Sequence, residues 1–311
     1  MAAHLYLPRD VVVESVEDLT PYLRRVVLTG PDLDRVHPTT LDRRIKLVLP
    51  RAEGDTLPDL PRDARWYDAW RALPDDARPA VRTYTARAVR PQDRALVVDL
   101  VLHDHPGPAG RWATTARPGD PLVAVCPVAG APGADRCGIA WHPGRATQVL
   151  LAGDETALPA IASILESLGD HVTGEVLLEV PSSGSDSSTS NSTASTASSD
   201  GDLALDAPPG VTVSVLPRGA RPHGEALEEA VRHTAWSPLE ESEVARREAL
   251  STGPEEILWD EPQHVSADHY AWLAGESGLI RRLRRHLVGE RGWPRDRVAF
   301  MGYWSLGRPE S

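Results

Sequence analysis

Short apolar runs separated by turn residues fill the first 125 positions of the chain. Leu96, Val98, Leu100 and Leu102 occupy every second position, which is the period of a strand with one buried face. Six such runs without a strong helical pattern predict a small closed antiparallel barrel. In chain order from Asp10 they are VVVESV, YLRRVVLTG, RIKLVLP, VRTYTARAV, RALVVDLVLH and DPLVAVCPV.

The period changes in the second half of the chain. TQVLLAG, GEVLLEV and VTVSVLP are apolar strand runs, whereas DETALPAIASILESL predicts an amphipathic helix and GEALEEAVRHTAW a further helix. HYAWLAGES leads into the helical GLIRRLRRHLVGERG, and RVAFMGYW closes the pattern. Alternating strands and helices predict a parallel sheet with crossover helices, so the fold class is a β domain followed by an α/β domain.

A Gly/Pro/Ala-rich stretch, VAGAPGADRCG, follows Val125 and marks a domain boundary. We therefore expect domains at residues 1–130 and 145–311. Residues 51–80 interrupt the first with an excursion that carries a helical turn around Trp66 to Trp70. In the second, residues 181–208 are expected to be a disordered loop outside the sheet, because the Ser-rich core Ser182 to Asp200 cannot bury apolar surface. Residues 237–257 are a charged, helical insertion.

Charge and composition exclude several classes of protein. The net charge of −12 argues against binding to nucleic acid. Cys126 and Cys137 have no metal-ligand or disulfide spacing, so we expect no metal site and a reducing compartment. No apolar stretch reaches the roughly 18 residues of a membrane span and the N-terminus has no secretory pattern. We expect a cytoplasmic monomer.

The segment from Val81 to Arg90 contains the first candidate site. In a strand Arg82 and Tyr84 share one face, so a cation and a flat ring lie near the hydroxyl of Thr85. Arginine can bind a pyrophosphate, tyrosine can cover an isoalloxazine ring, and threonine can bond the ring near N5. This combination suits a flavin dinucleotide, although an ordinary half-buried strand also explains these residues.

The next segment, HDHPGPAGRWA, leaves a strand through small residues and enters a short helix. Backbone N–H groups at such a turn can face an anion. An ordinary glycine-rich turn explains the same residues. The spacing of His103 and His105 does not favour a metal site.

Two further turns, LAGDETALPA and AWLAGES, each lead from a strand into a helix. Each permits close approach of a dinucleotide to the backbone at the carboxyl end of a strand. The first lacks the GxGxxG pattern of a Rossmann fold, and either could be a capped helix alone. Two such turns in one sheet favour a bound ligand.

Together RTYT, HDHPGPAGRWA, LAGDETALPAI, YAWLAGES and GYW resemble, in this order, the siderophore-interacting protein family of flavin-dependent ferric-siderophore reductases, within the ferredoxin-reductase-like superfamily. The resemblance covers nearly the whole chain. It implies an N-terminal FAD-binding barrel and a C-terminal NAD(P)-binding α/β domain, with the nicotinamide meeting the flavin between them.

The resemblance also implies roles for individual residues. Thr85 and Tyr84 would act at the flavin as catalytic residues. Lys46, Arg44 and Arg308 would bind an anionic ferric siderophore, although Lys46 could equally be a surface lysine. Ser305 stands where the family often has a basic residue after GYW, which puts the affinity for the siderophore, or the choice of siderophore, in doubt. The cofactor-binding residues would be Arg82, Tyr84, Thr85, His103, Gly107, Pro108, Ala109, Gly110, Trp112, Ala113, Gly153, Asp154, Glu155, Thr156, Ala157, Ala274, Gly275 and Glu276.

The sequence therefore predicts an NAD(P)H-dependent flavoprotein, with FAD and either NADPH or NADH, that reduces ferric siderophores and releases Fe(II). A general NAD(P)H:flavin reductase or diaphorase would share these motifs and differ in its acceptor. A flavin-binding sensor or interaction protein is the alternative without catalysis.

Overall fold

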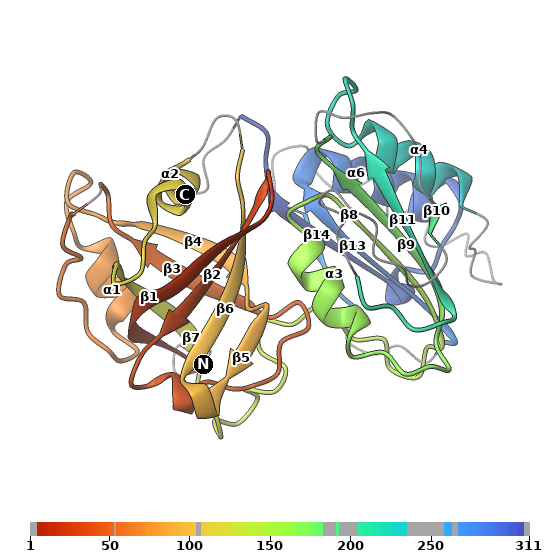
Figure 1. The fold of residues 1–311 in the computed structure, drawn as a ribbon. Helices are drawn as coiled ribbons and strands as arrows, with labels where there is room; N and C mark the ends of the chain where they lie inside the picture. Colours follow the sequence, from red (N-terminus) through yellow and green to blue (C-terminus); the bar gives the residue numbers. More distant parts are fainter. Residues whose placement is uncertain are drawn as a thin grey trace. The chain divides into compact units, whose positions relative to one another are not determined.

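The computed structural model describes residues 5–52, 54–103, 107–182, 191–192, 205–234, 258–262 and 267–307. It divides into two compact units, unit 1 at Met1–Ile139 and unit 2 at Ala140–Ser311 (Figure 1). None of the helices in the described ranges is long and apolar enough to cross a membrane.

Unit 1 is a curled antiparallel sheet of seven strands in the order β4-β3-β7-β1-β2-β6-β5 (Figure 1). Its elements are β1 (Tyr6–Thr20), β2 (Leu23–Thr29), the 3-10 turn η2 (Leu33–Arg35), β3 (Arg44–Leu49), α1 (Trp66–Arg71), β4 (Ala80–Thr85), β5 (Ala88–Arg90), the 3-10 turn η3 (Pro91–Asp93), β6 (Ala95–Val101), α2 (Pro108–Thr115) and β7 (Pro121–Pro127).

The β fold is confirmed, but the expected count of six strands was wrong, because VRTYTARAV forms two strands. β4 pairs with β3 at one edge of the sheet, and β5 pairs with β6 at the other. Between them Ala86 donates its N–H to Arg43 and Arg87 donates to Val97. The chain thus changes partner within two residues, which is possible because the curled sheet brings its edges close together.

The predicted strand around Leu96 forms β6, but it is buried on both faces. Leu96, Val98 and Leu100 belong to the inner core of the curled sheet. On the opposite face the carboxylate of Asp99, which is 4 % exposed, pairs with the guanidinium of Arg25 at 2.7 and 2.8 Å. A charged residue can therefore be buried here because it is paired and hydrogen-bonded.

The expected helical turn in residues 51–80 is confirmed as α1. Trp66 of this helix is buried in a second core cluster with Val48, Val123 and Val125, on the outer face of β3 and β7. α1 therefore covers the face of β3 opposite to the inner core.

Unit 2 has a mixed sheet in the order β10-β11-β9-β8-β13-β14-β12. The five central strands are parallel, and the short strands at both ends are antiparallel to their neighbours. The elements are β8 (Gln148–Gly153), α3 (Leu158–Leu165), β9 (Thr173–Val180), β10 (Asn191–Ser192), β11 (Val211–Pro217), α4 (Glu225–His233), β12 (Trp259–Asp260), β13 (His269–Glu276), α6 (Ser277–Arg284), the π-helical turn η5 (Arg285–Glu290), the 3-10 turn η6 (Arg295–Arg297) and β14 (Val298–Trp304).

Helices cover both faces of this sheet. α4 and α6 pack on one face, where their Leu227, Val231, Leu279 and Leu283 share a core with the strands, and α3 lies on the other face (Figure 1). All eight residues of α3 are buried, so the expected amphipathic pattern does not extend to this helix. Its sequence LPAIASIL contains a single polar side chain.

Two expectations concerned segments outside this sheet. Asn191 and Ser192, within the Ser-rich loop, pair with Ser214 and Val213 as β10, so the loop contributes two residues to the sheet that we expected it to avoid. The unpaired backbone groups of an edge strand accept almost any extended segment, which explains why side-chain composition gave no signal. The predicted insertion at 237–257 lies outside the described residues.

Candidate functional site

The segment predicted to bind flavin forms β4. Arg82 pairs with Leu47 of β3, and Tyr84 pairs with Ile45. Directly paired residues of an antiparallel sheet share a face, so Arg82 and Tyr84 project from the face that carries these buried aliphatic side chains. Both are half-buried, and the guanidinium of Arg82 donates to the carbonyl of Val81 at 2.9 Å.

α2 brings the second predicted segment to the same face. Ala109, Trp112 and Ala113 are buried in the inner core, and Tyr84 packs against that core. α2 also contacts β3, β4 and β6. Two segments that lie apart in the sequence, residues 82–85 and 107–113, thus meet within unit 1.

The N-terminal end of α2 can receive an anion. Gly107 precedes the helix, Pro108 is its first residue, and no side chain among the described residues caps it. The first N–H bonded within the helix is that of Arg111, which donates to the carbonyl of Gly107 at 3.0 Å, so the N–H groups of Ala109 and Gly110 precede the intrahelical bonds. A Cβ at Gly107 would meet no described atom within 4 Å. This open backbone fits a pyrophosphate.

The other end of α2 is held by Arg24, which sequence reasoning missed. Its guanidinium donates to the carbonyls of Ala113 and Thr114 at 2.8 and 3.0 Å, and Asp18 holds it at 2.5 and 3.0 Å. A cation at a helix C-terminus satisfies the last carbonyls and the helix dipole. Arg24 therefore fixes α2 on the sheet.

The residues expected to bind the siderophore lie on the other face of β3. Lys46 pairs with Thr83, to whose hydroxyl its ammonium group donates at 3.1 Å, and Arg44 pairs with Thr85. The pair therefore shares a face with these threonines rather than with Tyr84. Lys46 is exposed, and the Thr85 side chain is nearly covered.

The structure tells less about two other predicted residues. His103 of unit 1 is exposed and immediately precedes residues 104–106, which the structure does not describe. Arg308 of unit 2 lies outside the described residues.

In unit 2, Asp154 forms hydrogen bonds with three of the motifs found in the sequence: LAGDETALPAI, YAWLAGES and GYW. β8, β13 and β14 are adjacent in the sheet, and Asp154 follows β8. Its carboxylate accepts the N–H of Thr156 at 2.9 Å, the N–H of Glu276 at 2.8 Å and the indole N–H of Trp304 at 3.1 Å. The turns after β8 and β13 and the C-terminal GYW segment thus meet at one buried side chain.

The two glycines of these turns permit this close packing. A Cβ at Gly153 would lie 2.4 Å from the Cβ of Ala157 and 2.8 Å from the carbonyl oxygen of Ala274. Gly275 has φ +150°, and a Cβ there would lie 2.6 Å from a carboxylate oxygen of Asp154. A glycine at each of these two positions is therefore required for the turns to approach each other.

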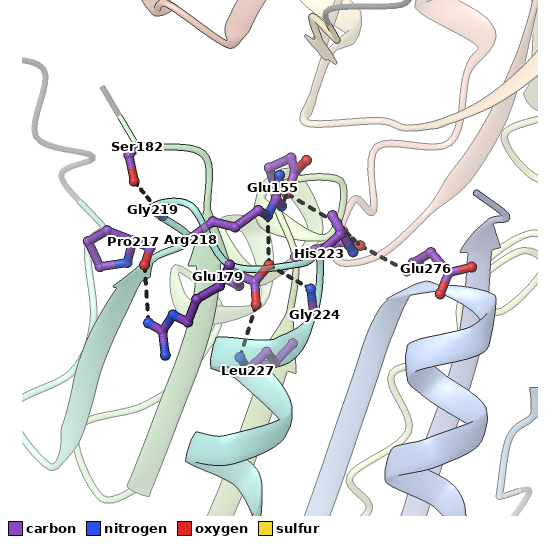
Figure 2. Close-up of polar contacts among 12 residues, drawn as sticks. Glu155, Glu179, Ser182, Pro217, Arg218, Gly219, His223, Gly224, Leu227 and Glu276 are labelled. Atoms are coloured by element: carbon purple, nitrogen blue, oxygen red, sulfur yellow. Dashed lines mark hydrogen bonds and ion pairs between the residues drawn. The ribbon is translucent and has the colours of Figure 1, made fainter. Parts of the chain in front are cut away.

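Beside Asp154, a buried ionic network spans the carboxyl ends of β8, β9 and β11 (Figure 2). Arg218 donates to Glu155 at 2.5 Å and to Glu179 at 2.8 Å. Glu179 also accepts the N–H groups of Gly224 and Leu227 at 2.8 and 3.0 Å, so it caps the start of α4, where glycine has no side chain to do so.

His223 completes this network. Its Nε2 lies 3.5 Å from a carboxylate oxygen of Asp154 and 3.7 Å from one of Glu155. Its ring also meets the Trp304 ring edge-on, with centroids 5.0 Å apart. The imidazole is therefore held between two carboxylates and an aromatic ring at the end of the sheet.

This arrangement shifts the pKa of each group in a different direction. Burial, and then the charge of Glu155, raise the pKa of Asp154. Burial would also raise the pKa of Glu155, but His223 and Arg218 outweigh it and lower that pKa. Burial would lower the pKa of His223, but the two carboxylates outweigh it and raise that pKa. The cluster therefore favours a charged His223 beside a charged Glu155.

The acidic side chains predicted at the cofactor turns point into the protein. Asp154 and Glu155 are 0 and 1 % exposed. Glu276 caps its own helix, accepting the N–H of Leu279 at 2.8 Å. These carboxylates fix the turns, and the backbone of the turns is what remains for a ligand.

Sequence reasoning missed Arg218, His223 and Glu179. A signal was present, because Arg218 and His223 follow the third parallel strand, VTVSVLP, in the loop PRGARPHG. Residues at the carboxyl ends of parallel strands line the ligand edge of such sheets.

Comparisons with known proteins agree with this arrangement. The model of the siderophore-interacting FAD-binding domain matches residues 12–131, and the model of the siderophore-interacting protein matches residues 146–197 and 190–307. An uncharacterized protein of Mycobacterium tuberculosis is 32% identical over 96% of this chain and 90% of its own length. Ferric vibriobactin reductase of Vibrio cholerae is 34% identical over 51% of this chain and 53% of its own length.

Solved structures extend this likeness. The crystal structure of a siderophore utilization protein from T. fusca has a TM-score of 0.70 and 27% identity, and the match covers 98% of this chain and 95% of that one. The ferredoxin reductase in carbazole 1,9a-dioxygenase shares the fold alone, with a TM-score of 0.56 and 16% identity over 96% of this chain and 70% of its own. The chain has a ferredoxin-reductase-like fold with an FAD-binding domain, and it belongs to the siderophore-interacting protein family.

Proposed function

We propose that this chain is an NAD(P)H-dependent ferric-siderophore reductase that holds FAD in unit 1 and binds NAD(P)H in unit 2. The observation that carries the proposal is the meeting of the β8 and β13 turns at Asp154. These neighbouring parallel strands flank the point where the strand order of unit 2 reverses, which is where dinucleotides bind in such sheets. A hydride source distinguishes a reductase from a protein that merely holds flavin and siderophore.

In unit 1, the Arg82 guanidinium and the N–H groups at the start of α2 would hold the FAD pyrophosphate. The Tyr84 ring would cover a face of the isoalloxazine, and the hydroxyl of Thr85 would bond its edge. Bound FAD would supply the conversion of a two-electron hydride donor into single electrons for Fe(III). The protein residues would position the ring and exclude water from it.

In unit 2, the backbone of residues 153–157 and 274–276 would hold the dinucleotide. Asp154 would act as a positioning residue, because its carboxylate fixes both turns. Acid–base catalysis by Glu155 is not needed, since hydride transfer to flavin requires no proton from this carboxylate.

The substrate would be an anionic ferric siderophore. Lys46 and Arg44 would supply a local positive charge on a protein whose net charge is −12. The names of ferric vibriobactin reductase and the T. fusca siderophore utilization protein support this substrate class. Reduction would release the iron because hard oxygen chelators hold Fe(II) less tightly than Fe(III), so no protein ligand to iron is required.

The test begins with the visible spectrum of the purified protein. We expect the spectrum of oxidised flavin, its loss on anaerobic addition of NADPH or NADH, and its return on addition of a ferric siderophore, with Fe(II) captured by a colour-forming chelator. Turnover with free flavin but not with ferric chelates would identify a general flavin reductase. A spectrum unchanged by both coenzymes would rule out the reductase function.

A further inference from the structure

The hairpin of β1 and β2 holds the segment that contains α2 from both ends. Before the helix, Leu102 donates its N–H to the carbonyl of Tyr22 at 2.8 Å. In the last turn of the helix, the carbonyls of Ala113 and Thr114 accept hydrogen bonds from the guanidinium of Arg24 at 2.8 and 3.0 Å. The N-terminal end of α2, where we place the FAD pyrophosphate, lies between these contacts. Its position therefore depends on the hairpin.

α2 needs such contacts because it is short. It has eight residues, and an isolated helix of that length is not stable in water. Its buried residues are Ala109, Trp112 and Ala113, and each alanine removes little apolar surface from water. Polar contacts at the end of the helix therefore matter for its position.

Arg24 is suited to hold this end of the helix. The carbonyls of Ala113 and Thr114 are among the last four of the helix, which have no partner within it. The Arg24 side chain is 17% exposed, and Asp18, its directly paired neighbour on β1, binds the guanidinium with both carboxylate oxygens. A partly buried cation at a helix C-terminus stabilises the helix through the last carbonyls and the dipole.

Arg25 makes a similar ion pair on the other face of the hairpin. It binds both carboxylate oxygens of Asp99 at 2.7 and 2.8 Å, and the Asp99 side chain is 2% exposed. Consecutive residues of a strand project to opposite faces. Arg24 pairs with Leu100 and shares the face of the inner core on which α2 packs, so Arg25 projects from the outer face. Two adjacent arginines thus bind aspartates in the same way, and Arg24 is the one that bonds to α2.

We propose that Arg24 is a positioning residue for FAD, which holds α2 at its C-terminal end so that the N–H groups at its N-terminal end meet the pyrophosphate. This inference rests on the placement of the pyrophosphate proposed above. The helix is about 12 Å long at 1.5 Å per residue, so Arg24 acts through the helix and not by touching the cofactor. The fraction of molecules with α2 in place then sets the apparent affinity for FAD.

The test measures the dissociation constant of FAD for the purified holoprotein, with free FAD separated by ultrafiltration. Arg24→Met should raise this constant about tenfold. A partly buried cation at a helix C-terminus contributes at most about 2 kcal/mol, which sets an upper limit of about 30-fold. Arg24→Lys keeps the cation without the fork and should recover part of the affinity. The visible spectrum of bound FAD should not change in Arg24→Met, because the proposed ring contacts lie on β4.

Arg25→Met is the matched control. It leaves the Asp99 carboxylate, 2% exposed, without its closest cation, whereas Arg24→Met leaves an Asp18 side chain that is 59% exposed and stays solvated. Arg25→Met should therefore lower the urea midpoint more than Arg24→Met does. It should leave the dissociation constant of FAD unchanged. If Arg24 had a structural role alone, FAD affinity would fall with stability in both variants.

Wild-type FAD affinity in Arg24→Met, or an equally large loss of affinity in Arg25→Met, would overturn the proposal. If Arg24→Met does not fold, Asp18→Asn decides, because it removes the charge that orients Arg24 and alters an exposed residue. A rise of the dissociation constant by about two- to fivefold in that variant supports the proposal, and an unchanged constant counts against it.

Anaerobic addition of NADPH or NADH tests the reductase function separately. Bleaching of the flavin together with an unchanged FAD affinity in Arg24→Met refutes the role of Arg24 alone. Absence of bleaching together with the expected changes in affinity refutes the reductase function and leaves the role of Arg24 in place.

Discussion

Replacing Arg218 by methionine tests whether the buried ionic network of Arg218, Glu155 and Glu179 stabilises the carboxyl ends of the parallel strands in unit 2. The change removes the guanidinium and keeps much of the side-chain volume. Glu155 and Glu179, 1 and 0 % exposed, then lose their shared cation. Breaking a buried ion pair in this way costs about 3–5 kcal/mol.

The expected loss lies near the lower end of that range. Glu179 keeps two backbone donors, and Glu155 keeps His223 at 3.7 Å. A loss of about 3 kcal/mol, with a urea dependence of roughly 2 kcal/mol per molar, lowers the unfolding midpoint of unit 2 by about 1.5 M. Arg221→Met is the matched control from the same loop, and its exposed ion pair predicts a loss below about 1 kcal/mol.

The assay is urea unfolding followed by tryptophan fluorescence, together with hydrogen exchange of the first turn of α4, which Glu179 caps. In Arg218→Met this turn should exchange faster. The loss of stability should also shrink as pH falls. The pKa of Glu155 is lowered in the folded state, so its stabilising effect is present above its usual value of 4.5 and disappears as pH falls through the folded pKa. Equal midpoints for Arg218→Met and Arg221→Met would refute the reasoning.

The remaining predictions concern separate parts of the molecule. Arg82→Ala should lower FAD affinity about 10- to 150-fold, because a charge-assisted contact is worth about 1.5–3 kcal/mol; full FAD occupancy after dialysis would contradict this. Lys46→Glu should weaken binding of an anionic ferric siderophore and flatten the salt dependence of that binding. Reduction of FAD by NADPH should persist, since Lys46 lies on the face of β3 opposite to Tyr84. Equal loss of both activities would place Lys46 at the flavin. The raised pKa of His223 gives stability that is present below its usual pKa of 6.5 and lost as pH rises through the folded pKa. The urea midpoint of the wild type should therefore fall between pH 6 and pH 8.5, and His223→Gln should remove this fall. An unchanged fall in the variant would mean that another group causes it. Deleting residues 183–200, which keeps Ser182 on Gly219, should leave the flavin spectrum and the reductase rate nearly unchanged; loss of either would give the Ser-rich segment a role.

Periodicity predicted the fold well because both kinds of sheet leave a local signal. The alternation at Leu96 to Leu102 marks the side chains that face the inner core of the curled sheet, and the alternating strands and helices of unit 2 mark a sheet covered by crossover helices. The division of VRTYTARAV into β4 and β5 could not be predicted, because it depends on curling that brings two distant edges together. β10 was missed because edge pairing uses backbone groups, which do not depend on side-chain pattern.

The sequence predicted the two turns of the candidate site in unit 2, but not the ionic network beside them. Gly153, Gly275 and their acidic neighbours marked the turns after two strands, and the structure places them side by side. Arg218, Glu179 and His223 come from three loops or strands whose contacts depend on the order of strands in the sheet. Arg24 was missed for the same reason. Its role at the end of α2 depends on hydrogen bonds to Ala113 and Thr114, which lie 89 and 90 positions later in the chain.

The two Ala-Gly-acid turns look alike in the sequence, but their acids make different hydrogen bonds, and the difference follows from the length and direction of each side chain. Asp154 extends to the neighbouring turn and accepts the N–H of Glu276, which the absence of a side chain at Gly275 permits. The longer Glu276 folds back to cap its own helix through Leu279. A ligand at this edge therefore meets backbone whose position one buried carboxylate determines from both sides. The charge of Glu155 is offset within the protein by Arg218 and His223, so an anionic dinucleotide bound as proposed would meet less repulsion than the number of acids suggests.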